Sequence, residues 1–358
     1  MDHSVASAKI DIETVKQDVD TLLQDFCDAR LAQASLQDAG YAELWRSISE
    51  LVHVGGKRMR PYLTMLAYDI YGGTNYASVL YTAAAQELLH LSMLIHDDII
   101  DRDDIRYGID NVSGKYAKKY LESSADDGRH YATGAAILAG DAVLSSAYMM
   151  ILESPLDAGD KVYAAQTIGR SVFAVVGGEL RDMESIFHPF GDIDTLAIAQ
   201  YKTSIYSFVG PLLCGAGLAM VRTDELDHLE EFGINVGIAF QLADDMLGVF
   251  GDENITGKSA MSDLTEGKRT YMMQYAFNHA DAQQKVVLDE LFGNEAMSQE
   301  QADTIRDIIR NSGAVEATEQ CIQEYAERAR VALSKLSIGD TAAQPLHELI
   351  LKSTKRDK

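Results

Sequence analysis

A group of aspartates interrupts an otherwise apolar stretch at residues 87–101. These residues are Asp97, Asp98 and Asp101, called the first acidic cluster below. Asp97 and Asp101 are four residues apart, so on a helix they share one face, about 6 Å apart along the axis. Like charges at this spacing repel each other, and burying them without partners costs free energy. Two interpretations stay open: a helix end paired with Arg102 and Arg106, or a divalent-cation site, because hard cations prefer oxygen ligands.

A second apolar stretch, residues 240–252, carries Asp244 and Asp245 in the same way. This pair is called the second acidic cluster. One acidic pair on a buried helix would be weak support for a metal site. Two pairs on separate helices predict two metal-binding walls that face each other across a cavity, because Mg²⁺ takes one or two carboxylates from the protein plus substrate phosphates.

Cations stand beside glycines at several places in the chain. The basic turn, residues 55–61, reads Gly-Gly-Lys-Arg-Met-Arg-Pro, and backbone amides with cations form an anion site. A solvated run of charges is the alternative interpretation. Lysine follows glycine again at Lys258 and Lys268, and Lys202-Thr203 lies in another predicted helix.

The charge and cysteine content of the chain limit the kinds of partner and the cell compartment that we expect. A formal net charge of −24 over 358 residues argues against a nucleic-acid partner, which needs a basic surface. An anionic substrate then needs divalent cations or a local basic pocket. The three cysteines match no metal or redox spacing, so we expect reduced thiols in a cytoplasmic protein. We expect neither a signal peptide nor a transmembrane segment, and we interpret residues 205–221 as buried helices.

The elements that position these residues are predicted to be helices. Only 5 prolines occur, strand-like alternation is essentially absent, and apolar residues recur with helical spacing. Two helices are expected in residues 61–101, and residues 102–130 are expected to be polar and irregular, with a loop tip at 126–128. Further helices are expected at 132–152, 160–187, 193–220, 223–248, 268–280, 283–293, 299–312 and 314–336. This pattern predicts one all-α domain, with its motif-bearing core at about 50–280 and a polar insertion at about 109–130.

Six motifs occur in the order found in the trans-isoprenyl diphosphate synthases, which form the polyprenyl synthetase family. The chain resembles this family, and within it the geranylgeranyl and medium-chain polyprenyl diphosphate synthases most. The motifs are the basic turn, Asp-Asp-Ile-Ile-Asp101, Ile-Leu-Ala-Gly-Asp141, Lys202-Thr203, Phe-Gln-Leu-Ala-Asp-Asp245 and Thr-Gly-Lys258. The match runs from about Gly55 to Thr270. Chance agreement of all six in order is negligible.

The resemblance implies a fold, a reaction and a set of site residues. The fold is a helical bundle around a deep central cavity, usually a homodimer, and the reaction condenses isopentenyl diphosphate with an allylic diphosphate. Two or three Mg²⁺ ions, for which Mn²⁺ can substitute, would be held by both acidic clusters. The catalytic residues would be Asp97, Asp101, Asp244, Lys202 and Lys258. The allylic diphosphate would be bound by Arg106, Thr203, Gln241 and Lys268, and isopentenyl diphosphate by Lys57, Arg60 and His90.

The chain departs from the family pattern at two positions. Tyr107 stands where the family usually has a second arginine, which contacts isopentenyl diphosphate. Gly248 stands where the second acidic motif usually ends in aspartate. Asp252 is two turns from Asp244, about 12 Å along a continuous helix, which is too far for both to bind one ion. The Gly248 departure predicts a weaker second metal wall, and the Tyr107 departure predicts a weaker affinity for isopentenyl diphosphate.

Product length depends on residues one and two turns before Asp97. In the family the growing tail runs along this helix, so Leu89, Ser92 and Met93 would line or floor the tunnel. Farnesyl synthases place bulky aromatics four and five residues before the first aspartate. Ser92 is small and Met93 is adaptable, so we expect an all-trans product of twenty carbons or somewhat more.

Three alternatives stay open at this point. A non-catalytic regulatory subunit or a terpene cyclase could share the fold, and the two departures favour that interpretation. His96-Asp97 could also belong to a metal-dependent phosphohydrolase. That class, however, has no use for the second acidic cluster or the basic turn.

Overall fold

The structure is a computed structural model that describes residues 10–120, 124–251 and 260–354. These residues are predominantly helical, and their β-structure is one short antiparallel hairpin, which confirms the all-α prediction. The chain divides into two compact units. The first consists of residues 1–168 and 211–221, and the second of residues 169–210 and 222–358. The expectation of a single domain stays a prediction.

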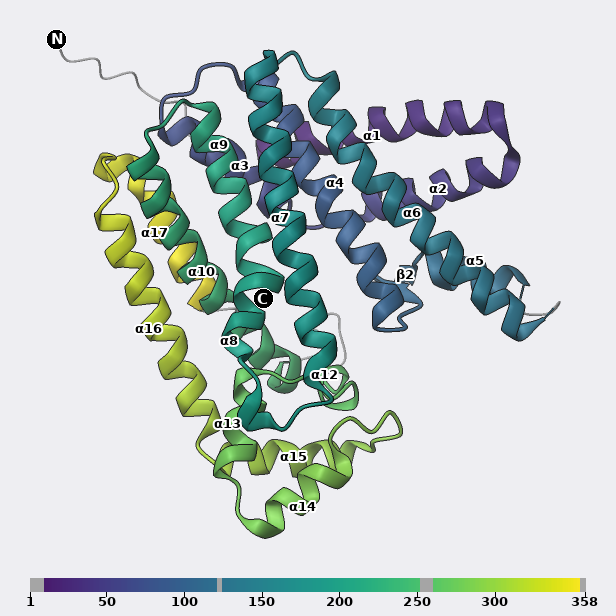
Figure 1. The fold of residues 1–358 in the computed structure, drawn as a ribbon, viewed down its shortest axis with the longest axis vertical. Helices are drawn as coiled ribbons and strands as arrows, with labels where there is room; N and C mark the ends of the chain where they lie inside the picture. The colour runs from purple at the N-terminus through teal and green to yellow at the C-terminus, as the bar shows by residue number, and fades with distance from the viewer. Residues whose placement is uncertain (1–9, 121–123, 252–259, 355–358) are drawn as a thin grey trace. The chain divides into compact units, whose positions relative to one another are not determined.

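The first unit contains the helices that carry the first acidic cluster and the basic turn (Figure 1). Its elements are α1 (Ile12–Gln37), α2 (Ala39–Val54), α3 (Met59–Ile70), α4 (Tyr76–Ile100), β1 (Ile105–Arg106), β2 (Ile109–Asp110), α5 (Val112–Tyr120), α6 (Ala125–Glu153), the start of α7 (Ala158–Ser185) and most of α9 (Gly210–Leu218).

The second unit contains the second acidic cluster on a long helix, α10. Its elements are the end of α7, the 3₁₀ turn η1 (Phe190–Asp192), α8 (Thr195–Ile198), the π-helix η2 (Ala199–Val209), α10 (Thr223–Phe250), α12 (Ser262–Thr265), α13 (Tyr271–His279), α14 (Ala282–Leu291), α15 (Gln299–Asn311), α16 (Ala314–Ser334) and α17 (Asp340–Thr354).

Helices α4 and α6 pack closely where α6 carries Gly140. A Cβ atom at Gly140 would lie 2.1 Å from Nε2 of His96. One turn earlier on α4, the Ser92 hydroxyl donates a hydrogen bond to the Gly140 carbonyl at 2.9 Å. The missing side chain at Gly140 therefore sets how near α6 lies to the helix that ends in the first acidic cluster.

The segment that we predicted to be irregular contains helix α5 and the first turns of α6, so that prediction is wrong there. Ser124 caps α6, because its hydroxyl accepts a hydrogen bond from the Asp127 amide at 3.3 Å. Asp126 and Asp127 lie in the first turn, where a carboxylate is favoured by the positive end of the helix dipole. Helix α5 forms because Val112 and Tyr116 bury one face.

Helix α6 is also the one part of the described chain that is long and apolar enough to cross a membrane. This stretch, residues 126–153, has a mean hydropathy of 1.7 in its most apolar window, and 50% of that window is buried inside the protein. A core helix of a water-soluble protein has the same properties, so this is weak support for a membrane span.

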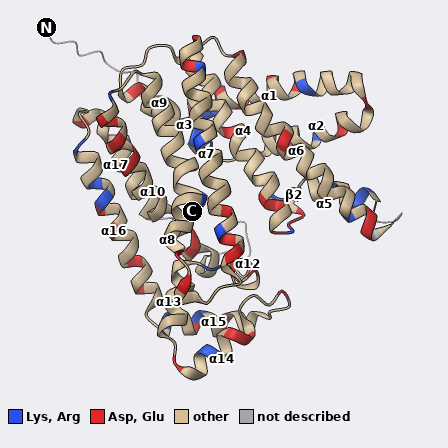
Figure 2. Ribbon diagram, in the orientation of Figure 1, with Lys and Arg blue, Asp and Glu red and all other residues tan. Residues whose placement is uncertain are grey.

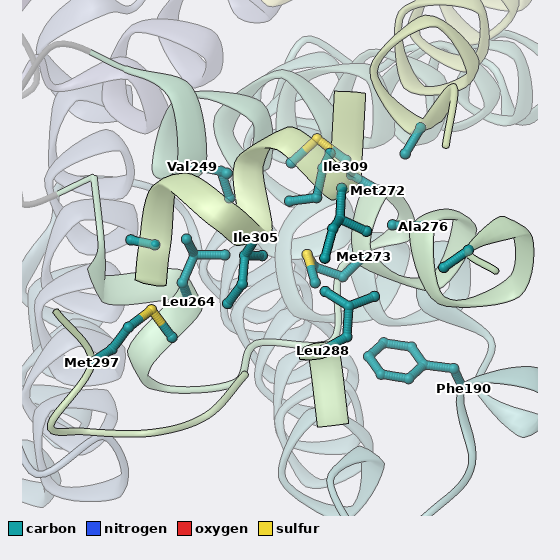
Figure 3. Close-up of a cluster of buried hydrophobic side chains, with 14 residues drawn as sticks. Phe190, Val249, Leu264, Met272, Met273, Ala276, Leu288, Met297, Ile305 and Ile309 are labelled. Carbon is teal, nitrogen blue, oxygen red and sulfur yellow. The ribbon is translucent and has the colours of Figure 1, made fainter. Parts of the chain in front are cut away.

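The second unit has a core of its own around α13, α14 and α15 (Figure 3). Its buried side chains include Leu264, Met272, Met273, Leu288, Ile305 and Ile309. Helix α15 buries residues at helical spacing and starts with a capping box, in which Ser298 and Gln301 satisfy each other's backbone amides. This core anchors the short helix α12 through Leu264, which is fully buried.

The π-helix η2 lies between two helices that approach its backbone through glycines. A Cβ atom at Gly178 of α7 would lie 2.3 Å from the Lys202 amide nitrogen, and one at Gly237 of α10 would lie 2.5 Å from the Ser204 Cα atom. Residues with larger side chains at these positions would push η2 outwards. Two glycines therefore place the helix that carries Lys202 and Thr203.

Two adjacent glycines of α7 allow a matched test of this contact. Gly178→Ala should lower the free energy of unfolding by about 1–3 kcal/mol, because the added methyl overlaps the η2 backbone. Gly177→Ala should raise it by less than about 1 kcal/mol, because a Cβ atom there meets nothing within 4 Å and alanine favours a helix. Urea denaturation measures both, and equal midpoints for the two variants would contradict the proposed contact.

Candidate active site

The first acidic cluster lies at the C-terminal end of α4, beside β2 (Figure 2). Arg106 reaches it from β1: its Nε donates to Asp98 Oδ1 at 2.7 Å, and its Nη2 donates to Asp97 Oδ2 at 3.3 Å. Asp98 is 3% exposed, whereas Asp101 is exposed at the helix C-cap. The structure thus brings Asp97, Asp98 and Arg106 into contact as one group.

A tight hairpin holds Arg106 in this position. Arg106 pairs with Ile109, so the loop consists of Tyr107 and Gly108. Both residues have positive φ, 55° and 78°, as a type I′ turn requires at its two central positions. Tyrosine rarely adopts this conformation. The turn between Arg106 and Ile109 therefore directs the guanidinium back towards the end of α4.

Burial of Asp98 dominates its protonation behaviour. Burial raises the pKa of Asp98 to about 6, although the Arg106 guanidinium opposes the rise, and the charges of Asp97 and Asp103 add to it. The negative end of the α4 dipole further disfavours carboxylate charge here. A divalent cation would relieve this concentration of negative charge.

The basic turn divides into one structural arginine and two other cations. Arg58 is 5% exposed and has a left-handed backbone, with φ of 50°. Its guanidinium donates to Asp20 Oδ1 at 2.7 Å, to Glu87 Oε1 at 2.8 Å and to the Val52 carbonyl at 2.6 Å. Arg58 therefore joins α1, α2 and α4, while Lys57 is exposed and Arg60 is half-buried.

His90 lies on α4 near this turn and is electrostatically surrounded by arginines. Burial lowers the pKa of His90 well below its ordinary value, and the charges of Arg60, Arg106 and Arg58 lower it further. The imidazole is neutral at physiological pH as a result. His90 and Tyr107 also line one small cavity, together with Arg58 and Glu87, so the Tyr107 departure lies in the same neighbourhood as the basic turn.

The three residues predicted to set product length differ in their surroundings. Leu89 is fully buried, and so is Ser92, whose hydroxyl is bonded to Gly140 of α6. Met93 is half-buried. Ser92 therefore contributes to the contact between α4 and α6, and the tunnel role of all three residues stays a prediction.

The second acidic cluster belongs to a chain of polar contacts within the second unit. The Thr203 hydroxyl donates to Gln241 Oε1 at 2.6 Å, and Gln241 Nε2 donates to Asp245 Oδ1 at 2.7 Å. The same Asp245 oxygen lies 3.6 Å from the Lys268 ammonium nitrogen. Four predicted site residues are thus joined, while Asp244, on the same turn of α10, is half-buried.

Charges in this group shift two pKa values. Burial raises the pKa of Asp245 to about 6, with Lys268 opposing the rise and Asp263 adding to it. Burial alone would lower the pKa of Lys268, but Asp263, Asp245, Asp182 and Asp244 raise it well above its ordinary value. Lys268 is therefore a permanent cation beside the second acidic cluster.

Lys202 is held by two carboxylates of α7 that the sequence analysis did not identify. Its ammonium nitrogen lies 2.9 Å from Glu179 Oε2 and 2.7 Å from Asp182 Oδ2. Glu179 directly follows Gly178, so the glycine contact and the ion pair act at one place. An acid–x–x–acid pattern after two glycines was the available signal, but solvated helix faces often have it.

The donor sets suit a divalent cation bound together with a phosphate. Across residues 10–120, 124–251 and 260–354, no three His, Cys, Asp or Glu side chains converge on a preformed metal site. Mg²⁺ needs no such cage, because it is usually held by one or two carboxylates plus substrate phosphates. Each cluster offers carboxylates next to a cation, and one carboxyl group in each, Asp98 or Asp245, has a pKa raised to about 6. The residues therefore fit a magnesium–diphosphate group.

Some predicted features cannot be placed. Lys258 and Asp252 lie outside the described residues. The first acidic cluster belongs to the first unit and the second acidic cluster to the second unit. That the two clusters face each other across a cavity therefore stays a prediction.

Comparison with known proteins identifies the family. Residues 42–309 match the polyprenyl synthetase family, which covers the basic turn, both acidic clusters and the polar chain around Asp245. The chain belongs to the polyprenyl synthetase family. The earlier resemblance is thereby confirmed, and a metal-dependent phosphohydrolase is excluded as the family.

Several relatives of this polyprenyl synthetase are similar over most of their length. Geranylfarnesyl diphosphate synthase of Aeropyrum pernix is 32% identical over 310 residues, which are 84% of this chain and 90% of that protein. Geranylgeranyl diphosphate synthase of Sulfolobus acidocaldarius is 31% identical over 82% of this chain and 85% of its own length. The crystal structure of geranylgeranyl pyrophosphate synthase from Corynebacterium glutamicum, complexed with isoprenyl diphosphate and magnesium, has a TM-score of 0.90 and 31% identity, covering 97% of this chain and 100% of that one.

The different surroundings of Arg58 and Lys57 in the basic turn can be tested through protein stability. Arg58→Ala should lower the free energy of unfolding by about 3–5 kcal/mol, because it leaves Glu87 buried without its cation. Lys57→Ala, one residue away and exposed, should change it by less than about 0.5 kcal/mol. Chemical denaturation followed by circular dichroism measures the difference.

A gentler variant guards against a failure of Arg58→Ala to fold. Arg58→Lys keeps the charge but loses the planar fork that makes three contacts, so it should fall between the wild type and Arg58→Ala. If Arg58→Lys or Arg58→Ala unfolded at the wild-type midpoint, the buried contacts would be irrelevant to stability.

Proposed function

We propose that this polyprenyl synthetase is an active isoprenyl diphosphate synthase, which condenses isopentenyl diphosphate with an allylic diphosphate. The observation that supports this best is the pairing of carboxylates with a cation at two helix ends: Asp97 and Asp98 with Arg106, and Asp245 with Lys268. Carboxylates suit a divalent cation and the neighbouring cations suit phosphate oxygens. A diphosphate needs both.

The reaction begins when the C–O bond of the allylic diphosphate breaks. Negative charge then grows on the departing diphosphate, and positioned cations stabilise it. Within the second unit, Lys202 and Lys268 meet its oxygens, while Thr203 and Gln241 position the group around Asp245. Arg106 is the corresponding cation beside the first acidic cluster. Mg²⁺, when bound by the acidic clusters, neutralises part of the diphosphate charge and makes it a better leaving group.

The second substrate binds at the basic turn. Lys57 and Arg60 hold the diphosphate of isopentenyl diphosphate, and His90 donates an N–H without adding charge, because its lowered pKa keeps it neutral. The isopentenyl double bond then attacks the allylic cation, and the new cation gives one proton to the released diphosphate. No protein nucleophile is needed for this sequence of steps.

The product has twenty carbons or somewhat more. Relatives named as geranylgeranyl and geranylfarnesyl diphosphate synthases support this range. So do Ser92 and Met93, which stand where farnesyl synthases have aromatic residues. Met93 lies four residues before Asp97 and Leu89 eight, about 6 and 12 Å along the helix axis. Met93 is the better placed of the two to limit the tail, because Leu89 is fully buried.

The setting of the reaction is part of the proposal. The enzyme is a cytoplasmic homodimer without a nucleic-acid partner, and Mn²⁺ can replace Mg²⁺. The Tyr107 and Gly248 departures leave two other outcomes for an assay. A regulatory subunit would form no product, and a terpene cyclase would release pyrophosphate and hydrocarbon without consuming isopentenyl diphosphate.

A direct assay tests the reaction and its metal dependence. The protein with labelled isopentenyl diphosphate, an allylic primer and Mg²⁺ should form a polyprenyl diphosphate, and excess chelator should abolish turnover. Asp97→Ala should lower the rate by about 100-fold or more, since electrostatic stabilisation of the leaving group is lost. Asp126→Ala, an exposed acidic residue on α6, is the control. Undiminished turnover in chelator would refute the metal dependence.

Product length has its own test at Met93. Met93→Phe should shift the main product towards fifteen carbons, because a rigid ring would close the tunnel one turn below Asp97. Met149→Phe, at an exposed position of α6, should leave the product unchanged. Ser92 is unsuitable for this test, because a large side chain there would break the contact with Gly140. If Met93→Phe left the product unchanged, the tail would follow another path.

A further inference from the structure

The glycine that interrupts the second acidic motif has a carboxylate next to it in space. A Cβ atom at Gly248 would lie 2.0 Å from Oδ2 of Asp263 and 2.7 Å from its Cγ. No real Cβ atom approaches another atom this closely. The carboxylate of Asp263 therefore occupies the space that any side chain at position 248 would need.

Asp263 also contacts the cation of the second acidic cluster. Its Oδ1 lies 4.0 Å from the Lys268 ammonium nitrogen, which is 3.6 Å from Asp245 Oδ1. The Asp263 side chain is 16% exposed and that of Asp245 is 9% exposed. Lys268 thus lies between two largely buried carboxylates, one from α10 and one from α12.

The backbone around both positions is held by a single buried arginine. Arg306 of α15 donates from Nε to the Val249 carbonyl at 2.8 Å and from Nη2 to the Ala260 carbonyl at 3.0 Å. Val249 directly follows Gly248, and Ala260 precedes α12. Arg306 therefore clamps the end of α10 to the start of the segment that delivers Asp263.

Two further contacts fix Asp263 along its own segment. Its carbonyl accepts a hydrogen bond from the Lys268 amide at 3.0 Å, and the Leu264 carbonyl accepts one from the Gly293 amide at 2.9 Å. The Leu264 side chain is fully buried in the core of the second unit (Figure 3). The position of Asp263 is thus set by packing as well as by charge.

We propose that Asp263 supplies the third carboxylate of the second acidic cluster, from α12 instead of α10, and that Gly248 leaves the space for it. This inference rests on the proposed function, because the cluster is taken to receive a divalent cation with a diphosphate. Oxygen donors are what such a cation prefers. Asp263 also positions Lys268 for the phosphate oxygens. The second acidic cluster then has three carboxylates despite the glycine.

One consequence runs against the family pattern. Gly248→Asp would restore the usual residue of the motif, yet here it should weaken the site, because the new side chain displaces the Asp263 carboxylate and adds a like charge beside it. Gly248→Ala should weaken it too, since its methyl group alone overlaps Asp263. Moving the carboxylate, with Gly248→Asp and Asp263→Gly together, should restore part of the affinity.

Binding of inorganic pyrophosphate to the full chain in the presence of Mg²⁺ tests the proposal without relying on turnover. Isothermal titration calorimetry should show affinity about 10-fold or more weaker for Asp263→Asn and for Gly248→Asp. The double variant should bind more tightly than Gly248→Asp alone, a non-additivity expected of groups that share one space. Glu266→Gln, an exposed acidic position three residues after Asp263, should bind as the wild type does.

The outcomes separate this inference from the proposed function. If the wild type fails to bind pyrophosphate with Mg²⁺, both are overturned. If the wild type binds it but Asp263→Asn binds equally well, or Gly248→Asp binds more tightly, the role of Asp263 alone is refuted. Thermal melting identifies any variant that misfolds. Should Asp263→Asn do so, Gly248→Ala carries the test, and wild-type affinity in that variant refutes the proposal.

Discussion

Carboxylates of like charge at the ends of buried helices are the constraint on which this structure depends. Burial raises the pKa of both Asp98 and Asp245 to about 6, so each helix end needs a cation nearby. Arg106 supplies one from the hairpin that follows α4, and Lys268 supplies the other from the segment after α12. In both cases the cation lies on a short segment outside the helix that carries the carboxylates. Its position therefore depends on how that segment folds against the helix.

Much of the fold followed from local patterns in the sequence. The aspartates of α4 and α10 were recognisable because they interrupt apolar helices, and the breaks at glycine and proline marked most helix ends. The sequence analysis did not predict the start of α6, although the sequence indicates its N-cap. Ser124 precedes two aspartates that favour a helix N-terminus. The polarity of that stretch was mistaken for irregular structure.

Roles that depend on distant contacts could not be predicted in this way. Lys57, Arg58 and Arg60 are equivalent as a charge run, and only the left-handed backbone at Arg58 turns that side chain into the core. Lys202 was identified, but Glu179 and Asp182, which hold it, lie 23 and 20 residues away. The hydrogen-bond pattern that makes η2 a π-helix likewise leaves no mark in apolar periodicity.

The clamp formed by Arg306 bears on how much of the chain the enzyme needs. All six sequence motifs end by Lys258, yet the carbonyls of Val249 and Ala260, which follow the second acidic cluster, are joined by Arg306. This arginine lies on α15, 46 residues after Ala260. A shortened chain that ended before α15 would keep every motif and lose this support. The smallest functional length is therefore set by packing within the second unit, and the C-terminal helices are part of the site's architecture.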